Sequence, residues 1–176
     1  MRETPEAMFN TDDVLAFGQD TIDELVARAQ RAPRGRYRLC LHASTEDRVQ
    51  EMVVATTAAS YGRPHCHPDG PASLYVIEGE LAFFVFDAAG RVQRKVELGA
   101  RGGGRPFCVR VAPGVWHMDL VRSGAAVFLE TMAGPFVKDR SNLYAPWAPA
   151  GGDAAAVRAF LQSLGEPGPG PEGRAP

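Results

Sequence analysis

Hydrophobic and polar residues follow a helical period near the N-terminus of the chain. Apolar residues recur there at i, i+3, i+4 and i+7: Ile22, Leu25, Val26 and Ala29. This spacing is typical of one buried helix face. Thr21 and Glu24 have the S/T-x-x-E form of a capping box. We therefore predict a helix that begins at Thr21 and ends near Ala32, before Pro33.

From residue 36 onward the pattern changes to short apolar runs separated by Gly- and Pro-containing turns. These runs cover residues 36–42, 49–57, 73–78, 81–86, 91–98, 107–112, 117–121 and 125–132. Evenly spaced short strands without helices between them indicate a sandwich or barrel.

A second helix is predicted near the C-terminus, with Asp153 as its N-cap. Its apolar face consists of Val157, Phe160, Leu161 and Leu164. The predicted organisation is an N-terminal segment and helix (1–35), a β domain (36–150), a C-terminal helix (151–164) and a disordered Gly/Pro tail (165–176).

Composition narrows the classes of partner. The formal net charge of the 176 residues is −2, which favours neither nucleic acid nor an anionic membrane. No apolar stretch approaches a membrane-spanning length, and the N-terminus does not resemble a signal peptide. Three cysteines with no CxxC pair argue against a disulfide framework. We expect a cytoplasmic protein with reduced thiols.

The chain has four histidines, and three of them have spacing typical of a metal site. On an extended strand His65 and His67 point to the same face, roughly 6.5 Å apart, while Cys66 points away. His117 follows the turn Pro113-Gly114, where another strand begins. The alternative is a set of surface or hydrogen-bonded core histidines.

The sequence around these histidines resembles the two cupin motifs. Gly62-Arg63-Pro64-His65-Cys66-His67 with Glu78-Gly79 resembles the first motif, and Pro113-Gly114-Val115-Trp116-His117 resembles the second. Over residues 20–165 the chain looks similar to the WbuC-type cupins, which are often encoded beside polysaccharide-synthesis genes. The segments that carry this similarity are 36–42, 47–52, 85–87, 134–136 and 145–149.

The resemblance implies an all-β fold, an RmlC-like cupin. This fold is a double-stranded β-helix jelly-roll barrel, here with a short N-terminal helix and a C-terminal helix. It also implies one divalent metal on His65, His67 and His117. The glutamate ligand of the family is replaced by Ala72, so Asp69 or water is left as the fourth ligand. A three-imidazole site suits Zn, Fe(II), Ni or Cu.

The strand over residues 36–42 has one polar face. Arg36, Arg38, Cys40 and His42 share this face. If it lines the barrel, Arg36 and Arg38 bind a substrate carboxylate or phosphate and His42 transfers protons. The alternative is an edge strand with a solvated polar face.

Two further residues complete the candidate site. Glu130 lies in the apolar run 126–132, where a buried carboxylate needs a partner. It is a second candidate for proton transfer, or an acceptor that orients a ligand histidine, or a structural ion-pair partner. Tyr75 is a candidate substrate contact and, like Phe83 and Trp116, a candidate for the core or pocket wall.

Three functional hypotheses follow. The first is a metal-dependent protein that acts on or binds a small anionic, sugar-derived ligand. The second is a three-histidine iron dioxygenase, and the third is a non-catalytic module that senses a ligand or a metal. Because the fold does not decide among them, all three stay open. The resemblance and the need to cover a sheet edge also predict a homodimer.

Overall fold

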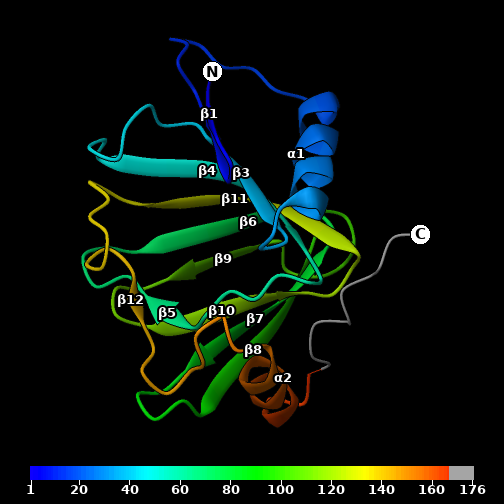
Figure 1. Ribbon diagram of the computed structural model, residues 1–176, viewed down its shortest axis with the longest axis vertical. Helices are drawn as coiled ribbons and strands as arrows, with labels where there is room; N and C mark the ends of the chain where they lie inside the picture. Colours follow the sequence, from blue (N-terminus) through cyan, green and yellow to red (C-terminus); the bar gives the residue numbers. More distant parts are fainter. Residues whose placement is uncertain (167–176) are drawn as a thin grey trace.

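The computed structural model describes residues 1–166 as two helices and twelve strands (Figure 1). The first half contains β1 (Arg2–Thr4), β2 (Ala7–Phe9), α1 (Gln19–Arg31), β3 (Arg36–Cys40), β4 (Val49–Thr57), β5 (His65–Cys66), β6 (Ala72–Glu78) and β7 (Glu80–Phe86). The second half contains β8 (Val92–Gly99), β9 (Cys108–Val111), β10 (Trp116–Val121), β11 (Ala125–Ala133), β12 (Leu143–Tyr144) and α2 (Ala154–Ser163).

The strands form two sheets that face each other. The larger sheet has the order β1-β2-β3-β4-β11-β6-β9, and the smaller sheet has the order β12-β5-β10-β7-β8. Within residues 1–166 every strand pair is antiparallel except β2 with β3. Apolar side chains from both sheets, such as Val54, Phe128, Leu81 and Phe83, pack together between them. This packing confirms the predicted all-β jelly roll.

Each helix covers the outer face of one sheet. Ile22, Leu25 and Ala29 of α1 pack against Leu39 and Val53 of the larger sheet. Val157 and Leu161 of α2 pack against apolar residues of the smaller sheet, among them Phe84 and Met118. The helices therefore leave the inner faces of both sheets free to build a site.

Both predicted helices are present, but the predicted N-cap of the first helix is wrong. Asp153 caps α2, since its Oδ1 accepts hydrogen bonds from the main-chain N–H groups of Ala155 and Ala156. Helix α1 instead begins at Gln19 with Gly18 as N-cap and no side-chain cap. Thr21 therefore lies inside the first turn, and the predicted capping box does not form.

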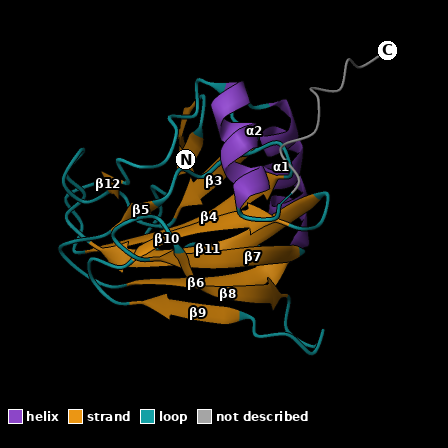
Figure 2. Ribbon diagram, turned by 90° about the horizontal axis from the view of Figure 1, so that it is seen from below, coloured by secondary structure: helices purple, strands orange, loops and turns teal. Residues whose placement is uncertain are grey.

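The eight predicted strands are all present, with ends that differ by at most two residues. Four short strands were not predicted. β1 and β2 form a hairpin that extends the larger sheet beside β3, while β5 and β12 pair with each other at the edge of the smaller sheet. Figure 2 shows β5 and β12 on the left and α1 on the right, as in Figure 1.

The C-terminal prediction needs a correction at Glu166. This residue is buried, and its carboxylate pairs with Lys95 at 2.8 Å and with Arg122, so the predicted disorder does not begin at residue 165. Opposite charges hold Glu166 against the smaller sheet. The rest of that prediction, residues 167–176, lies outside the described residues.

All three cysteines are free thiols, with Cys40 and Cys66 buried and Cys108 exposed. Neither helix of residues 1–166 has the length and apolar character that a membrane crossing requires.

Candidate metal centre

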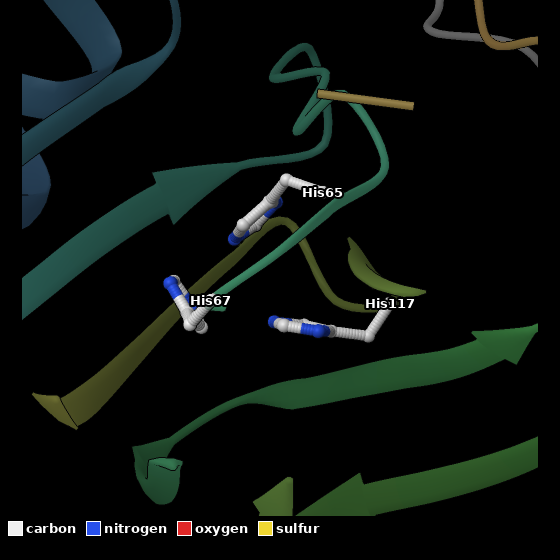
Figure 3. Close-up of side chains that lie close together, drawn as sticks. All are labelled: His65, His67 and His117. Carbon is white, nitrogen blue, oxygen red and sulfur yellow. The ribbon is translucent and has the colours of Figure 1, made fainter. Parts of the chain in front are cut away.

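Three histidines from different parts of the chain converge between the sheets. His65 lies on β5, His67 follows this strand, and His117 lies on β10 directly opposite His65 in the pairing of the two strands. One nitrogen of each ring lies within 4.8 Å of a nitrogen of the other two. Figure 3 shows the three rings pointing toward a common space. The structure therefore brings together the three predicted metal ligands.

Main-chain carbonyl groups fix the orientation of each ring. A carbonyl oxygen only accepts hydrogen bonds, so the Nδ1 atom beside it carries the proton and Nε2 keeps its lone pair. The three Nδ1–oxygen distances are 3.0 Å from His65 to Arg63, 3.2 Å from His67 to Ser141 and 2.8 Å from His117 to Val115.

The Nε2 atom of His67 is the most informative of the ring nitrogens. It is buried and has no hydrogen-bond partner among the described residues. A buried polar atom without a partner costs free energy unless something else binds it. Because its lone pair faces the other two imidazoles, a metal ion fits these three residues.

The electrostatics of the pocket keep two of these rings uncharged. Burial, and next the proximity of His67, lowers the pKa of His65 from 6.5 to about 4. Burial, and next the proximity of His65, lowers the pKa of His117 to about 3. Both rings are therefore neutral at neutral pH, which is the form that binds a metal.

No carboxylate of the described chain joins the three histidines. Ala72, at the position where the family has a glutamate, is buried on β6. Asp69 is exposed, and its Oδ2 accepts a hydrogen bond from Nε of Arg140 at 3.0 Å. Asp69 therefore does not replace the missing ligand.

A large cavity adjoins the histidines. Its volume is about 1320 Å³, and its wall includes His65 and four side chains from the first predicted strand: Arg36, Arg38, Cys40 and His42. Arg38 is paired with Val54, which belongs to the core between the sheets. Side chains directly opposite each other lie on the same face of a sheet. The polar face of this strand is therefore turned inward, and the solvated-edge alternative is wrong.

Two carboxylates also lie on the inner faces. Glu130 lines the cavity from β11, where it is paired with Met52 and Leu74. Asp119 lines it from β10, two residues after His117 and opposite the core residue Phe83. Asp119 was not among the predicted site residues, although its spacing from His117 puts both residues on one strand face.

Asp119 and Arg36 are neighbours that do not touch. A second cavity of about 10 Å³, near the size that holds one water molecule, has both residues in its wall. Burial raises the pKa of Asp119, while the charge of Arg36 opposes this and that of Glu130 adds to it. Within residues 1–166, Arg36, Arg38, Asp119 and Glu130 form no ion pair.

His42 is the last residue on the polar face of the first predicted strand, and it is buried. Its Nδ1 lies 2.8 Å from the carbonyl oxygen of Glu51 and 3.0 Å from the N–H nitrogen of the same residue. Phe9 packs edge-on against its ring at 6.4 Å. His42 is thus held by one ring nitrogen in the wall of the cavity.

Tyr75 does not reach this cavity. On β6 it is paired with Leu129, which packs on the outer face of the larger sheet, and its ring contacts Phe107 at 5.2 Å. Its neighbours Leu74 and Val76 are the β6 residues that face inward. The structure therefore separates Tyr75 from the other candidate residues, and we do not propose it as a substrate contact.

The other two aromatic candidates lie in the core and the pocket wall, as expected. Phe83 is buried between the sheets and stacks on His117, with the ring centres 5.4 Å apart and the planes 19° apart. Trp116 packs against Trp147, 6.3 Å away, on the side covered by α2. Phe83 is therefore a wall of the histidine pocket.

Comparison with family models gives one match. Residues 17–98 match a family described as "Domain of unknown function (DUF6016)". This stretch is less than half of the chain, and it holds His65 and His67 but not His117. No curated protein matches the chain.

Solved structures share the fold at low sequence identity. A structure of oxalate oxidase in complex with glycolate is 15% identical, covers 69% of this chain and has a TM-score of 0.52. Another, described as a complex with the substrate analogue glycolate, is 14% identical, covers 77% and has the same TM-score. An oxalate decarboxylase from Lactobacillus farciminis is 17% identical, covers 58% and has a TM-score of 0.45.

This chain is shorter than these proteins. It spans 61% and 68% of the two oxalate oxidase chains and 27% of the decarboxylase chain. Oxalate oxidase is a cupin, and its two structures establish what the strand order and the packed sheets already indicate. The chain has the cupin jelly-roll fold.

Proposed function

We propose that this protein binds one divalent transition metal ion through His65, His67 and His117 and holds a small anionic ligand beside it. The observation that carries the proposal is the buried Nε2 atom of His67, which has no partner and faces two further imidazoles. Three imidazole nitrogen ligands suit Zn, Fe(II), Ni or Cu. When bound, such an ion supplies a positive charge that polarises a ligand oxygen.

Arg36 and Arg38 are proposed to bind the anion. Both guanidinium groups line the cavity that contains His65, and neither has a carboxylate partner within residues 1–166. Two unpaired cations beside a cationic metal site repel it. A carboxylate or phosphate between them removes this repulsion and accepts paired hydrogen bonds from the guanidinium groups.

His42 and Glu130 are proposed to hold or move a proton at the ligand. Since Glu51 binds Nδ1 of His42, its Nε2 is the nitrogen left for a ligand. Glu130 lines the same cavity from the neighbouring part of the larger sheet. If the protein is not an enzyme, the same residues bind the anion without turnover.

A second candidate function is a three-histidine iron enzyme that uses oxygen. The absence of a carboxylate beside the histidines, within the described residues, favours it. Iron in the purified protein, together with oxygen uptake on addition of a substrate, supports this candidate. Zinc or nickel without oxygen uptake contradicts it.

Two features suggested by the WbuC resemblance also belong to this proposal. The anionic ligand is proposed to derive from sugar metabolism, in polysaccharide synthesis. The protein is proposed to be a homodimer, because β9 and β1 are edges of the larger sheet. A monomer mass in light scattering at micromolar concentration contradicts the dimer.

The decisive experiment measures the metal content of protein purified without an affinity tag. We expect about one ion per chain and its loss in His65→Ala and His117→Ala. His42→Gln is the matched control, because His42 is also buried but lies outside the three-histidine group. Full metal content in a variant that lacks all three ligand histidines contradicts the proposal.

A further inference from the structure

The short strands β5 and β12 form one wall of the cavity. Tyr144 of β12 is paired directly with His65 of β5, so the two side chains lie on the same face of this ribbon. Both residues line the cavity. Tyr144 is 51% exposed, whereas Phe83, the aromatic wall of the histidine pocket, is 2% exposed. The cavity therefore presents an accessible aromatic ring next to a proposed metal ligand.

Two side chains lie beside the ring of Tyr144 without covering it. The guanidinium of Arg63 lies 5.6 Å from the centre of the ring, and the ring of His65 lies 6.3 Å away. Arg63 is itself fixed, because its Nη2 donates a hydrogen bond to the carbonyl oxygen of Ala145 at 2.7 Å. A ring with such neighbours loses less conformational freedom on ligand binding than a ring without contacts.

Two polar atoms of residues in this wall lack partners. Nε of Arg63 is a donor and Oδ1 of Asn142 is an acceptor, and both are buried without a hydrogen bond among the described residues. Both side chains line the cavity. Leaving a buried donor and a buried acceptor unpaired costs free energy, and a ligand whose hydroxyl groups reach both atoms recovers it.

We propose that the β5–β12 wall, made by Arg63, Asn142 and Tyr144, binds a hydroxylated ring that carries the acid group. A pyranose ring fits this chemistry, because its C–H face packs on an aromatic ring and its hydroxyl groups both donate and accept hydrogen bonds. The ligand class is therefore a sugar acid rather than a short-chain acid. The cavity of about 1320 Å³ has room for it. This inference rests on the proposed function, which places the acid group at Arg36 and Arg38.

The test compares two acids of equal charge on the metal-loaded full-length protein. D-Glucuronate has a hydroxylated ring, whereas D-glycerate has hydroxyl groups but no ring. Calorimetric titration gives the dissociation constant of each acid for each variant. We expect glucuronate to bind the unchanged protein about tenfold more tightly than glycerate, because only glucuronate packs on Tyr144.

Three variants test the contribution of the β5–β12 wall to ligand binding. Tyr144→Ala is expected to remove most of the preference for glucuronate while glycerate affinity and metal content stay unchanged. Tyr144→Phe should keep the preference, since the ring and not the hydroxyl group makes the contact. Asn142→Ala is expected to weaken glucuronate about fivefold, the scale of one hydrogen bond.

Leu143→Ala is the matched control for lost exposed apolar surface. Leu143 is 41% exposed and belongs to the same strand, but it is paired with Cys66 and so lies on the opposite face from Tyr144. This variant should keep both the metal and the preference for glucuronate. A loss of preference in Leu143→Ala equal to that in Tyr144→Ala contradicts the inference.

Other outcomes separate this inference from the proposed function. Equal affinity for the two acids with normal metal content overturns the ring site alone. Conversion of a dimer to a monomer by Tyr144→Ala, with the preference intact, also overturns it, because Tyr144 is then a subunit contact. Binding of neither acid by metal-loaded protein overturns the anion site and this inference with it.

Discussion

Asp69 lies 3.0 Å from Nε of Arg140, a residue 71 positions further along the chain. Both side chains are more than half exposed, so this ion pair contributes little to stability. The ion pair is informative about the metal site. Asp69 is the acid nearest in sequence to His67, and its side chain points to solvent. The histidine group therefore has nitrogen ligands only, within the described residues.

Restoring the carboxylate should change the metal preference. Ala72→Glu is expected to tighten metal binding and shift preference toward Mn or Fe, because an anionic oxygen ligand hardens the site. Ala72 is buried, so the new carboxylate should lower the melting temperature of the metal-free protein. Competition titrations and thermal melts measure these effects. Asp69→Asn is the control and should leave metal binding unchanged; unaltered selectivity in Ala72→Glu would show that residue 72 does not face the metal.

Arg38→Gln should weaken anion binding without weakening the fold. Arg38 has no ion-pair partner within residues 1–166, so the melting temperature of ligand-free protein should stay the same or rise slightly. Affinity for phosphate and glycerate should fall by about 1.5–3 kcal/mol, the scale of a hydrogen bond to a charged group.

Arg110→Gln is the control for the loss of a positive charge from the same sheet. Arg110 is exposed and is paired with Ser73 on β6, one position from the inward-facing Leu74. Anion affinity should be unchanged in this variant. A marked fall in the melting temperature of Arg38→Gln with normal anion affinity would identify Arg38 as a structural ion-pair partner, for example of Glu130.

The strands could be predicted because alternating polarity and Gly/Pro turns are local signals. The capping box was a false signal, because the N-cap of α1 is Gly18, three residues before Thr21. β5 and β12 are only two residues long, and they pair with each other across 77 and 79 positions of sequence, Cys66 with Leu143 and His65 with Tyr144. A sequence pattern contains no signal for such a contact.

The candidate site was also predictable from the sequence only in part. The three histidines and the parity of Arg36 and Arg38 follow from motif and strand geometry. The prediction of Tyr75 as a substrate contact was wrong because both faces of β6 are apolar. Only the packing of Leu74 and Val76 shows which face is inside. The predicted start of disorder at residue 165 was wrong because the composition of the tail gives no sign of the ion pairs of Glu166 with Lys95 and Arg122.

Acid should destabilise the metal-free protein through the histidines. The pKa values of His65 and His117 are lowered to about 4 and about 3 in the folded state, against an ordinary value of 6.5. At pH values between the folded-state and the ordinary pKa, the unfolded chain binds more protons than the folded chain. The free energy of unfolding therefore falls as the pH drops below about 6.5. Asp119 acts in the opposite direction because its folded-state pKa is raised.

Urea unfolding of metal-free protein at several pH values between 7 and 4 measures this effect. His117→Gln removes one of the two groups and should flatten the pH dependence. The same pH dependence in His117→Gln as in the unchanged protein would show that the folded state does not lower the pKa of His117.

Loss of the α2 cap should destabilise the fold modestly. Asp153 accepts hydrogen bonds from the N–H groups of Ala155 and Ala156 at 3.1 and 3.0 Å. Asp153→Ala should therefore lower the free energy of unfolding by about 1 kcal/mol. Asp153→Asn keeps an acceptor oxygen and should cost less. Equal losses in denaturant unfolding of the two variants would mean that the charge, rather than the cap, is what matters.

The two-residue length of β5 has a consequence for kinetics. A strand this short has few main-chain hydrogen bonds, and such segments open far more often than the long strands β4 and β11. His65 lies on β5 and His67 follows it, so one local opening moves two of the three proposed ligands together. An ion bound there would exchange at the rate of this opening, long before the molecule unfolds. The rate of metal exchange and the overall stability of the fold can therefore evolve separately.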